Sequence, residues 1–149
     1  MKGFKFSLTA VMGYKEQVLE GKKREHAFAV QVVAEKEKTI KRLESECDDV
    51  IEDFNERKLE GMTIIDAQSY EIHIYILQKN IEKEYKLLAE LQRIESEKRE
   101  EVVVAKQEVS ALEKLRDKRL NEYNRAVLKE EELFIEELIT NQRATAAEI

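Results

Sequence analysis

Two long stretches of this chain, residues 7–57 and 66–142, contain no proline and consist mostly of residues that favour helix. The whole chain of 149 residues has no proline and only four glycines. With so few helix breakers and 39% charged residues, the composition differs from that of an ordinary compact domain. The pattern predicts two long helices separated by a short break.

Apolar residues recur in both stretches at alternating steps of three and four, the spacing that places them along one face of a supercoiled helix. The first stripe contains Leu8, Met12, Leu19, Ala29, Val33, Ile40, Leu43, Cys47, Val50 and Phe54, with Lys15, Lys22, His26 and Lys36 as polar interruptions. The second contains Tyr70, Ile74, Leu77, Ile81, Leu88, Leu91, Val102, Ala105, Val109 and Leu112, with Glu84, Glu95 and Lys98 as interruptions. We expect Ser7 to cap the first helix, with Phe4 and Phe6 packing back against its first turn.

The break between the stripes falls at about residues 58–65, where Gly61 is a natural helix end and Thr63 or Asp66 can cap the next helix. A short link between two helices favours an antiparallel hairpin. The predicted fold is therefore all-α: a long antiparallel two-helix coiled-coil hairpin with an overhanging C-terminal helix. We expect one coiled-coil domain over 1–149, with helices at about 7–57 and 66–142 and a short C-terminal tail.

The register of the hairpin follows from centring the turn near Met62, so that the numbers of facing residues add to about 124. Expected layers are Leu43 with Ile81, Cys47 with Leu77, Val50 with Ile74, Phe54 with Tyr70, Val33 with Leu91 and Met12 with Leu112. Two layers fit badly, because Ile40 would face Glu84 and Ala29 would face Glu95. A slip of one heptad stays open.

The second helix is longer than the first, and in this register Leu8 faces Arg116 where the first helix begins. Beyond that point the second helix continues for roughly 30 residues, or about 50 Å. Leu120, Tyr123, Val127, Phe134 and Leu138 form an apolar stripe there, interrupted by Glu131, with steps typical of a straighter helix. Nothing earlier in the chain is left to cover this stripe, which suggests another protein or a second copy.

Composition limits the possible partners. No apolar run approaches the roughly 20 residues that a membrane span requires, so we expect a soluble protein without direct membrane insertion. The single cysteine, Cys47, favours a reducing compartment, and the N-terminal residues do not resemble a signal peptide. A net charge of −6 argues against nucleic acid as a partner.

We expect no enzymatic activity, because the sequence shows no catalytic, cofactor-binding or metal-binding constellation. His26 and His73 are far apart and lack a neighbouring ligand at metal-binding spacing. No glycine-rich phosphate loop is present, and the many Glu residues are those of solvated helix faces. Cys47 lies on the stripe, where it acts as a small apolar residue.

Two apolar surfaces remain. The first combines the N-terminal residues with the overhanging stripe from Leu120 to Leu138, and self-association of two copies is its alternative explanation. The second lies around the turn, where a slightly wider hairpin core is an equally good explanation. The residues there are Ile64, Ile65, Tyr70, Ile72, His73, Ile76, Leu77, Asn80 and Ile81.

At both ends of the chain the residues resemble the FliJ family, coiled-coil proteins of the bacterial flagellar type III export apparatus. The family's FxFxL start is similar to FKFSLTAVMGYKEQVLEGKKREHA here, and its C-terminal block is similar to LEKLRDKRLNEYNRAVLKEEELFIEEL. The likeness covers nearly the whole chain, and its middle is generic coiled coil.

The resemblance implies a non-catalytic protein without cofactors, similar to the central stalk of rotary ATPases and monomeric on its own. Its implied partners are the hexameric flagellar export ATPase, the export-gate membrane protein and export chaperones, at the cytoplasmic face of the cell membrane. The implied ATPase-binding residues are Phe4, Phe6, Leu8, Val11, Arg116, Arg119, Leu120, Tyr123, Val127, Phe134 and Leu138. The implied gate-binding residues are His73, Leu77, Asn80 and Glu84, although His73 stands where the family has an aromatic residue.

Two alternatives stay open at this point. One is the equivalent stalk protein of a virulence type III secretion system. The other is a homodimeric structural coiled coil, in which the overhangs of two copies pair.

Overall fold

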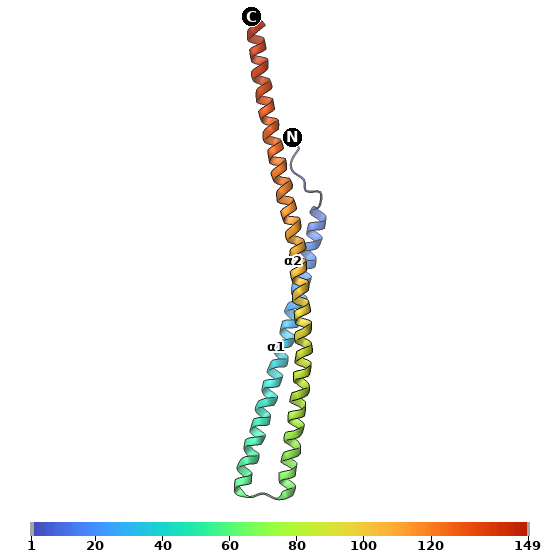
Figure 1. Cartoon of the computed structure of the whole chain (residues 1–149), viewed down its shortest axis with the longest axis vertical. Coiled ribbons are helices and arrows are strands. Elements are labelled where there is room, and N and C mark those ends of the chain that lie inside the picture. The colour runs from blue at the N-terminus through green and yellow to red at the C-terminus, as the bar shows by residue number, and fades with distance from the viewer. Residues whose placement is uncertain (1, 149) are drawn as a thin grey trace. The chain divides into compact units, whose positions relative to one another are not determined.

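The computed structural model describes residues 2–148, which form two helices, α1 (Thr9–Glu60) and α2 (Ile64–Glu148), and no strand (Figure 1). The predicted all-α architecture of two long helices packed as a hairpin is confirmed. α1 begins slightly later than expected and ends slightly later, and α2 extends beyond both of its expected bounds, so the link shortens to residues 61–63. The tail expected after residue 142 is helical as far as Glu148.

The link between the helices is formed as the sequence predicts. Gly61 has φ 99°, a left-handed conformation that glycine adopts without steric penalty, and it ends α1. The Thr63 hydroxyl accepts a hydrogen bond of 3.2 Å from the Asp66 N–H, which caps α2. Arg57 and Lys58 in the last turn of α1, and Asp66 in the first turn of α2, complement the helix dipoles.

The start of α1 differs from the prediction, because Ser7 is not its cap. The first α-helical bond runs from the Met12 N–H to the Leu8 carbonyl at 2.9 Å. The Thr9 hydroxyl donates to the Phe6 carbonyl at 2.6 Å, and the Ser7 hydroxyl instead accepts a bond of 2.9 Å from Arg119. The N-terminal segment (residues 2–8) is therefore held both by Thr9 at the start of α1 and by Arg119 of α2.

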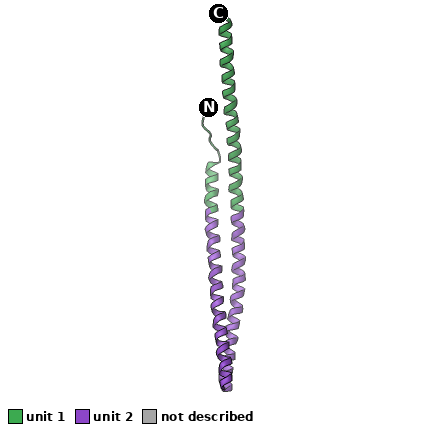
Figure 2. Cartoon of the chain, turned by 90° about the vertical axis from the view of Figure 1, so that its left-hand side faces the viewer, with its two compact units in different colours: residues 1–19, 104–149 green, residues 20–103 purple. Residues whose placement is uncertain are grey.

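The chain divides into two compact units (Figure 2). Unit 1 contains residues 1–19 with 104–149, and unit 2 contains residues 20–103. In unit 2, α1 and α2 form an antiparallel pair closed by the link. Its buried apolar residues are Ala29, Ile40, Cys47, Phe54, Leu77, Leu88 and Val102. All seven belong to the predicted stripes.

The register of unit 2 agrees with the prediction. The rings of Phe54 and Tyr70, an expected layer, meet edge to face with their centroids 5.1 Å apart. The Tyr70 hydroxyl donates to Asp53 at 2.6 Å, and that of Tyr85 donates to Glu44. These contacts leave no room for a slip of one heptad.

The polar interruptions of the stripes pair with acidic residues of the facing helix, which the sequence analysis did not foresee. In unit 2, Lys36 Nζ lies 2.7 Å from Glu84 Oε2, and His26 Nε2 lies 2.8 Å from Glu95 Oε1. Glu84 and Glu95 were expected to oppose Ile40 and Ala29, but each reaches a polar partner one turn away. In the two layers that fitted badly, Glu84 therefore forms an ion pair with Lys36, and Glu95 forms a hydrogen bond with His26.

The remaining interruptions pair in the same way. Lys22 lies 3.4 Å from Glu101, and Lys98 lies 3.4 Å from Glu25. In unit 1, Lys15 lies 3.0 Å from Glu108. Each pair is partly exposed and adds little free energy by itself, but an offset register would place these charges against apolar residues.

Candidate functional site

The N-terminal segment packs along α2 within unit 1. Phe6 is buried, with the Arg119 guanidinium 5.7 Å from the centre of its ring. The Phe4 and Tyr123 rings lie 5.6 Å apart, and the Tyr123 hydroxyl donates to the Lys2 carbonyl at 2.6 Å. Residues 2–8 therefore extend the contact with α2 beyond the beginning of α1.

This segment corrects the expected extent of the uncovered stripe. Leu120, Tyr123 and Val127 were expected to be bare, but all three are half-buried. Leu8 is also half-buried, whereas Val11 is 44% exposed. Cover was expected from the first helix alone, but Phe4, Phe6 and Ser7 before it also contact α2, as far as Tyr123.

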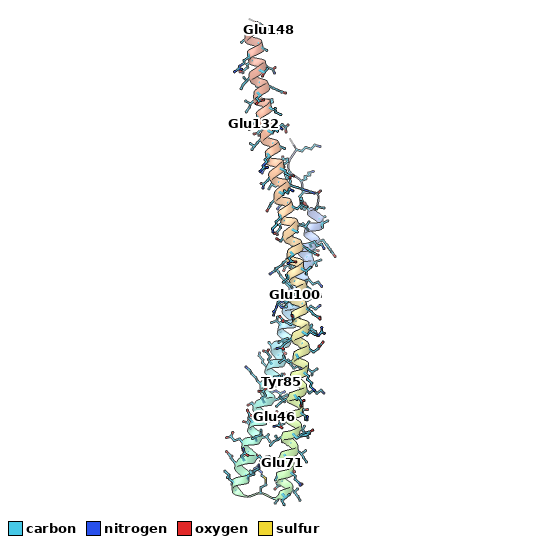
Figure 3. All side chains as sticks on the ribbon, viewed as in Figure 1. Glu46, Glu71, Tyr85, Glu100, Glu132 and Glu148 are labelled. Atoms are coloured by element: carbon cyan, nitrogen blue, oxygen red, sulfur yellow. The ribbon has the colours of Figure 1, made fainter. Side chains whose placement is uncertain are left out.

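Beyond Val127, the apolar side chains of α2 are exposed. Phe134 is 62% exposed and Leu138 is 47% exposed. Figure 3 shows side chains on all sides of α2 between the labelled Glu132 and Glu148, with no neighbouring helix. Six large apolar residues here are all at least 45% exposed and lie on several sides of α2, since three of them are consecutive; we name them together the bare C-terminal stripe: Leu128, Leu133, Phe134, Ile135, Leu138 and Ile139.

Charge is distributed unevenly over these terminal residues. Residues 129–149 contain six Glu against two basic residues, so the bare C-terminal stripe lies in an acidic stretch. Residues 114–119 contain four basic side chains and one Asp, and Arg116 lines a shallow hollow together with Phe4, Phe6 and Met12. Unit 1 therefore presents an acidic apolar surface and a separate basic surface along α2.

The predicted gate-binding row in unit 2 is not one exposed face. His73 and Asn80 are exposed, but Leu77 is 6% exposed because it packs between the helices. Glu84 is partly buried and holds Lys36. Four-residue spacing keeps the row on one side of α2, but that side overlaps the edge of α1. A partner therefore has direct access to only two of the four residues.

Other apolar residues near the link are exposed instead. Ile64 is 78%, Ile65 75%, Ile72 60% and Ile76 50% exposed. The alternative explanation, a wider hairpin core, is wrong for these four residues, because none of them is covered. It does describe Tyr70, Leu77 and Ile81, which are buried or half-buried against α1.

Taken together, the fold and its surfaces define the class of protein: an all-α coiled-coil protein with exposed apolar surfaces on both units. Along the described residues, neither helix has a segment that is long and apolar enough to cross a bilayer. The family model of the flagellar FliJ protein matches residues 4–147. The chain belongs to the FliJ family and is thus a flagellar protein associated with export. A search of curated proteins and a search of solved structures give no significant match.

Proposed function

We propose that this chain is a non-catalytic, stalk-like component of flagellar protein export that binds the hexameric export ATPase through unit 1. The single observation that carries the proposal is the bare C-terminal stripe, in a chain that matches the FliJ family over residues 4–147. A monomeric protein rarely keeps so many large apolar side chains in water unless a partner covers them. The family match is to a flagellar protein, which favours flagellar over virulence secretion.

The proposed ATPase-binding surface has two parts. The bare C-terminal stripe, including Phe134 and Leu138, inserts among apolar residues of the ATPase. The N-terminal segment and the basic side chains of Arg116 and Arg119 lie against its rim, where opposite charge would speed docking. Because Arg119 also contacts Phe6 and Ser7, its replacement would disturb both the surface and the N-terminal segment.

The mechanism follows from symmetry. A single asymmetric helix pair inside a six-fold ring contacts the six subunits unequally, so it stabilises some subunit conformations over others. That difference in binding free energy can promote ring assembly and link ATP hydrolysis to export. The chain needs no reactive group of its own for this role.

Pairing of two bare C-terminal stripes is disfavoured by charge. Glu130, Glu131, Glu132, Glu136 and Glu137 of one copy would approach the same residues of the other. We therefore expect a monomer at micromolar concentration in light scattering. A tight dimer would instead support the homodimeric structural coiled coil.

The gate-binding proposal rests on fewer exposed residues. We propose that His73 and Asn80 contact the export-gate membrane protein directly, and that Leu77 and Glu84 act by keeping α1 against α2. Exchange of His73 and Asn80 for Ala should weaken binding to the cytoplasmic domain of the gate protein without changing the melting temperature. Unchanged binding would refute the assignment. Escort of export chaperones and a cytoplasmic position at the inner face of the membrane belong to the same proposal.

The decisive experiment measures ATP hydrolysis by the purified export ATPase from the same organism, with increasing amounts of this chain. The intact chain should raise the rate. The double substitution Phe134→Gln and Leu138→Gln removes about 3 kcal/mol of apolar burial, so its half-maximal concentration should rise on the order of 100-fold.

Two controls locate the effect. Phe28→Gln with Val30→Gln replaces equally exposed apolar residues in unit 2 and should leave stimulation unchanged. Reversal of Arg116 and Lys118 to Glu should lower stimulation, whereas reversal of Lys38 and Lys41 should not. An intact chain without effect on hydrolysis would refute the proposed function, and equal losses in test and control variants would refute the assigned surface.

A further inference from the structure

A second coiled-coil stripe runs along α2 within unit 2, on the side that α1 does not cover. We call it the outward stripe and define it as Ile65, Ser69, Ile72, Ile76, Lys79, Lys83 and Lys86. Its steps alternate between four and three residues, which keeps all seven positions on one face of a supercoiled helix. All seven residues are exposed.

The outward stripe is distinct from the face that packs on α1. That face uses Tyr70, Ile74, Leu77, Ile81 and Leu88, all of which are buried or half-buried. The two stripes share no residue, and the outward stripe also excludes the proposed gate contacts His73 and Asn80. In unit 2, α2 therefore carries two coiled-coil faces, of which α1 covers one.

The apolar half of the outward stripe is unusual for a solvated face. Ile65, Ile72 and Ile76 are 75%, 60% and 50% exposed, and β-branched residues at stripe positions pack well against a second helix. A solvated helix surface normally carries charged or polar residues at such positions. Three isoleucines in register are therefore better explained by a partner helix than by solvent.

The other half of the outward stripe sets the charge of that partner. Lys79, Lys83 and Lys86 occupy three successive positions, and no position of the stripe holds a carboxylate. Glu82, beside the stripe, lies 3.4 Å from Lys79 and 3.9 Å from Lys86. One carboxylate shared by two lysines leaves net positive charge, which an acidic partner would neutralise.

A second copy of this chain fits the outward stripe poorly. Parallel pairing would place the three lysines against the same three lysines. Antiparallel pairing centred on Ile72 would place Lys79 against Ile65. A membrane surface also fits poorly, because interfacial helices carry lysines on the face opposite their apolar residues, whereas here both share one stripe.

We propose that the outward stripe binds an amphipathic helix of another protein, with aliphatic side chains opposite Ile65, Ile72 and Ile76 and Asp or Glu opposite Lys79, Lys83 and Lys86. The partner packs on α2 and completes a three-helix arrangement with α1. This inference rests on unit 2 alone, so it does not depend on ATPase binding through unit 1.

The test uses two synthetic helical peptides, each about four heptads long, as probes. The acidic probe carries Leu opposite the isoleucines and Glu opposite the lysines, and the basic probe replaces each Glu by Lys. We expect fluorescence anisotropy to show at least tenfold tighter binding of the acidic probe to the whole chain, with a preference that falls as salt rises.

Three variants locate the binding. Ile72→Gln with Ile76→Gln should weaken the acidic probe at least tenfold, and Lys79→Glu with Lys83→Glu and Lys86→Glu should reverse the preference between probes. The control Phe28→Gln with Val30→Gln should bind like the original chain. All changed side chains are exposed, so circular dichroism should show unchanged helix content.

Several results would overturn the inference. Equal binding of the two probes would refute the assignment of the binding site to the outward stripe. So would unweakened binding of the acidic probe to the folded variant with Ile72→Gln and Ile76→Gln. Binding to phosphatidylserine vesicles but not to the acidic probe would indicate a membrane surface instead, and dimerisation that these substitutions abolish would indicate a second copy. Stimulation of the export ATPase by the isoleucine variant should equal that of the original chain, so failure of this inference is separable from failure of the proposed function.

Discussion

The ion pair between Lys36 and Glu84 offers a direct test of what holds the two helices in register. The charged atoms are 2.7 Å apart, and the two side chains are 26% and 22% exposed. At this distance the Coulomb attraction is about 1.5 kcal/mol even with the dielectric constant of water. Ordering of both side chains offsets part of it, so we expect a coupling free energy of about 1 kcal/mol.

Replacing Lys36 by Glu exchanges this attraction for repulsion of similar size. The free energy of unfolding should therefore fall by about 2 kcal/mol at low salt, and by less at about 0.5 M salt, where screening is strong. The double variant Lys36→Glu with Glu84→Lys restores opposite charges and should recover at least half of the loss. Urea unfolding followed by circular dichroism measures the original chain, Lys36→Glu, Glu84→Lys and the double variant, which together form a double-mutant cycle.

A matched control is the pair of Lys23 and Glu20, which are 3.3 Å apart on one helix and 45% and 61% exposed. Replacing Lys23 by Glu should lower the free energy of unfolding by no more than about 0.5 kcal/mol. Equal effects of Lys36→Glu and Lys23→Glu would refute the reasoning. A double variant less stable than Lys36→Glu alone would refute it as well.

Three further predictions concern unit 2. Phe54 is 3% exposed, so Phe54→Ala should lower the free energy of unfolding, measured by urea unfolding, by about 3 kcal/mol. Leu59 is 90% exposed, so Leu59→Ala should change it little. Equal effects of the two substitutions would contradict the assigned core. The hydrogen bond from His26 lowers the pKa of Glu95 below its ordinary value of 4.5. The ionised Glu95 therefore stabilises the fold above that value, and this stabilisation is lost as pH falls through the lowered pKa. The melting temperature should drop between about pH 5 and pH 3, and it should drop less in Glu95→Gln. Burial raises the pKa of Cys47. A thiol reagent at about pH 8 should therefore react slowly with the folded chain and rapidly with the chain unfolded in urea. A fast reaction without urea would show that the two helices separate around Cys47.

The fold was predictable because the residue patterns that specify it are local and repeated. Alternating steps of three and four mark the face of each helix that packs, and Gly61 followed by Thr63 marks the turn. These signals were sufficient to place Phe54 against Tyr70. The pairing of Lys36 with Glu84 was not accessible from the register rule, which placed Glu84 opposite Ile40, one turn from Lys36.

The candidate surfaces were less predictable, because exposure depends on what lies across from a residue. Leu77 has the spacing of a gate-binding row, but it also lies on the stripe, and α1 covers it. The cover over Tyr123 comes from the N-terminal segment, through the Phe4 ring and the Lys2 carbonyl. This segment lacks the three- and four-residue spacing of the stripes, so the helical pattern did not indicate which part of α2 it covers.

The amino-acid sequence by itself determined two helices, the turn between them and the face of each that packs, since each depends on residues a few positions apart, whereas it left a slip of one heptad in the register open. Only the tertiary structure decided where burial ends: which polar interruptions meet, how far the N-terminal segment covers α2, and which isoleucines near the link remain in water. The physical reason is that a stripe defines a direction on a helix, whereas burial requires atoms from elsewhere in the chain to be present in that direction.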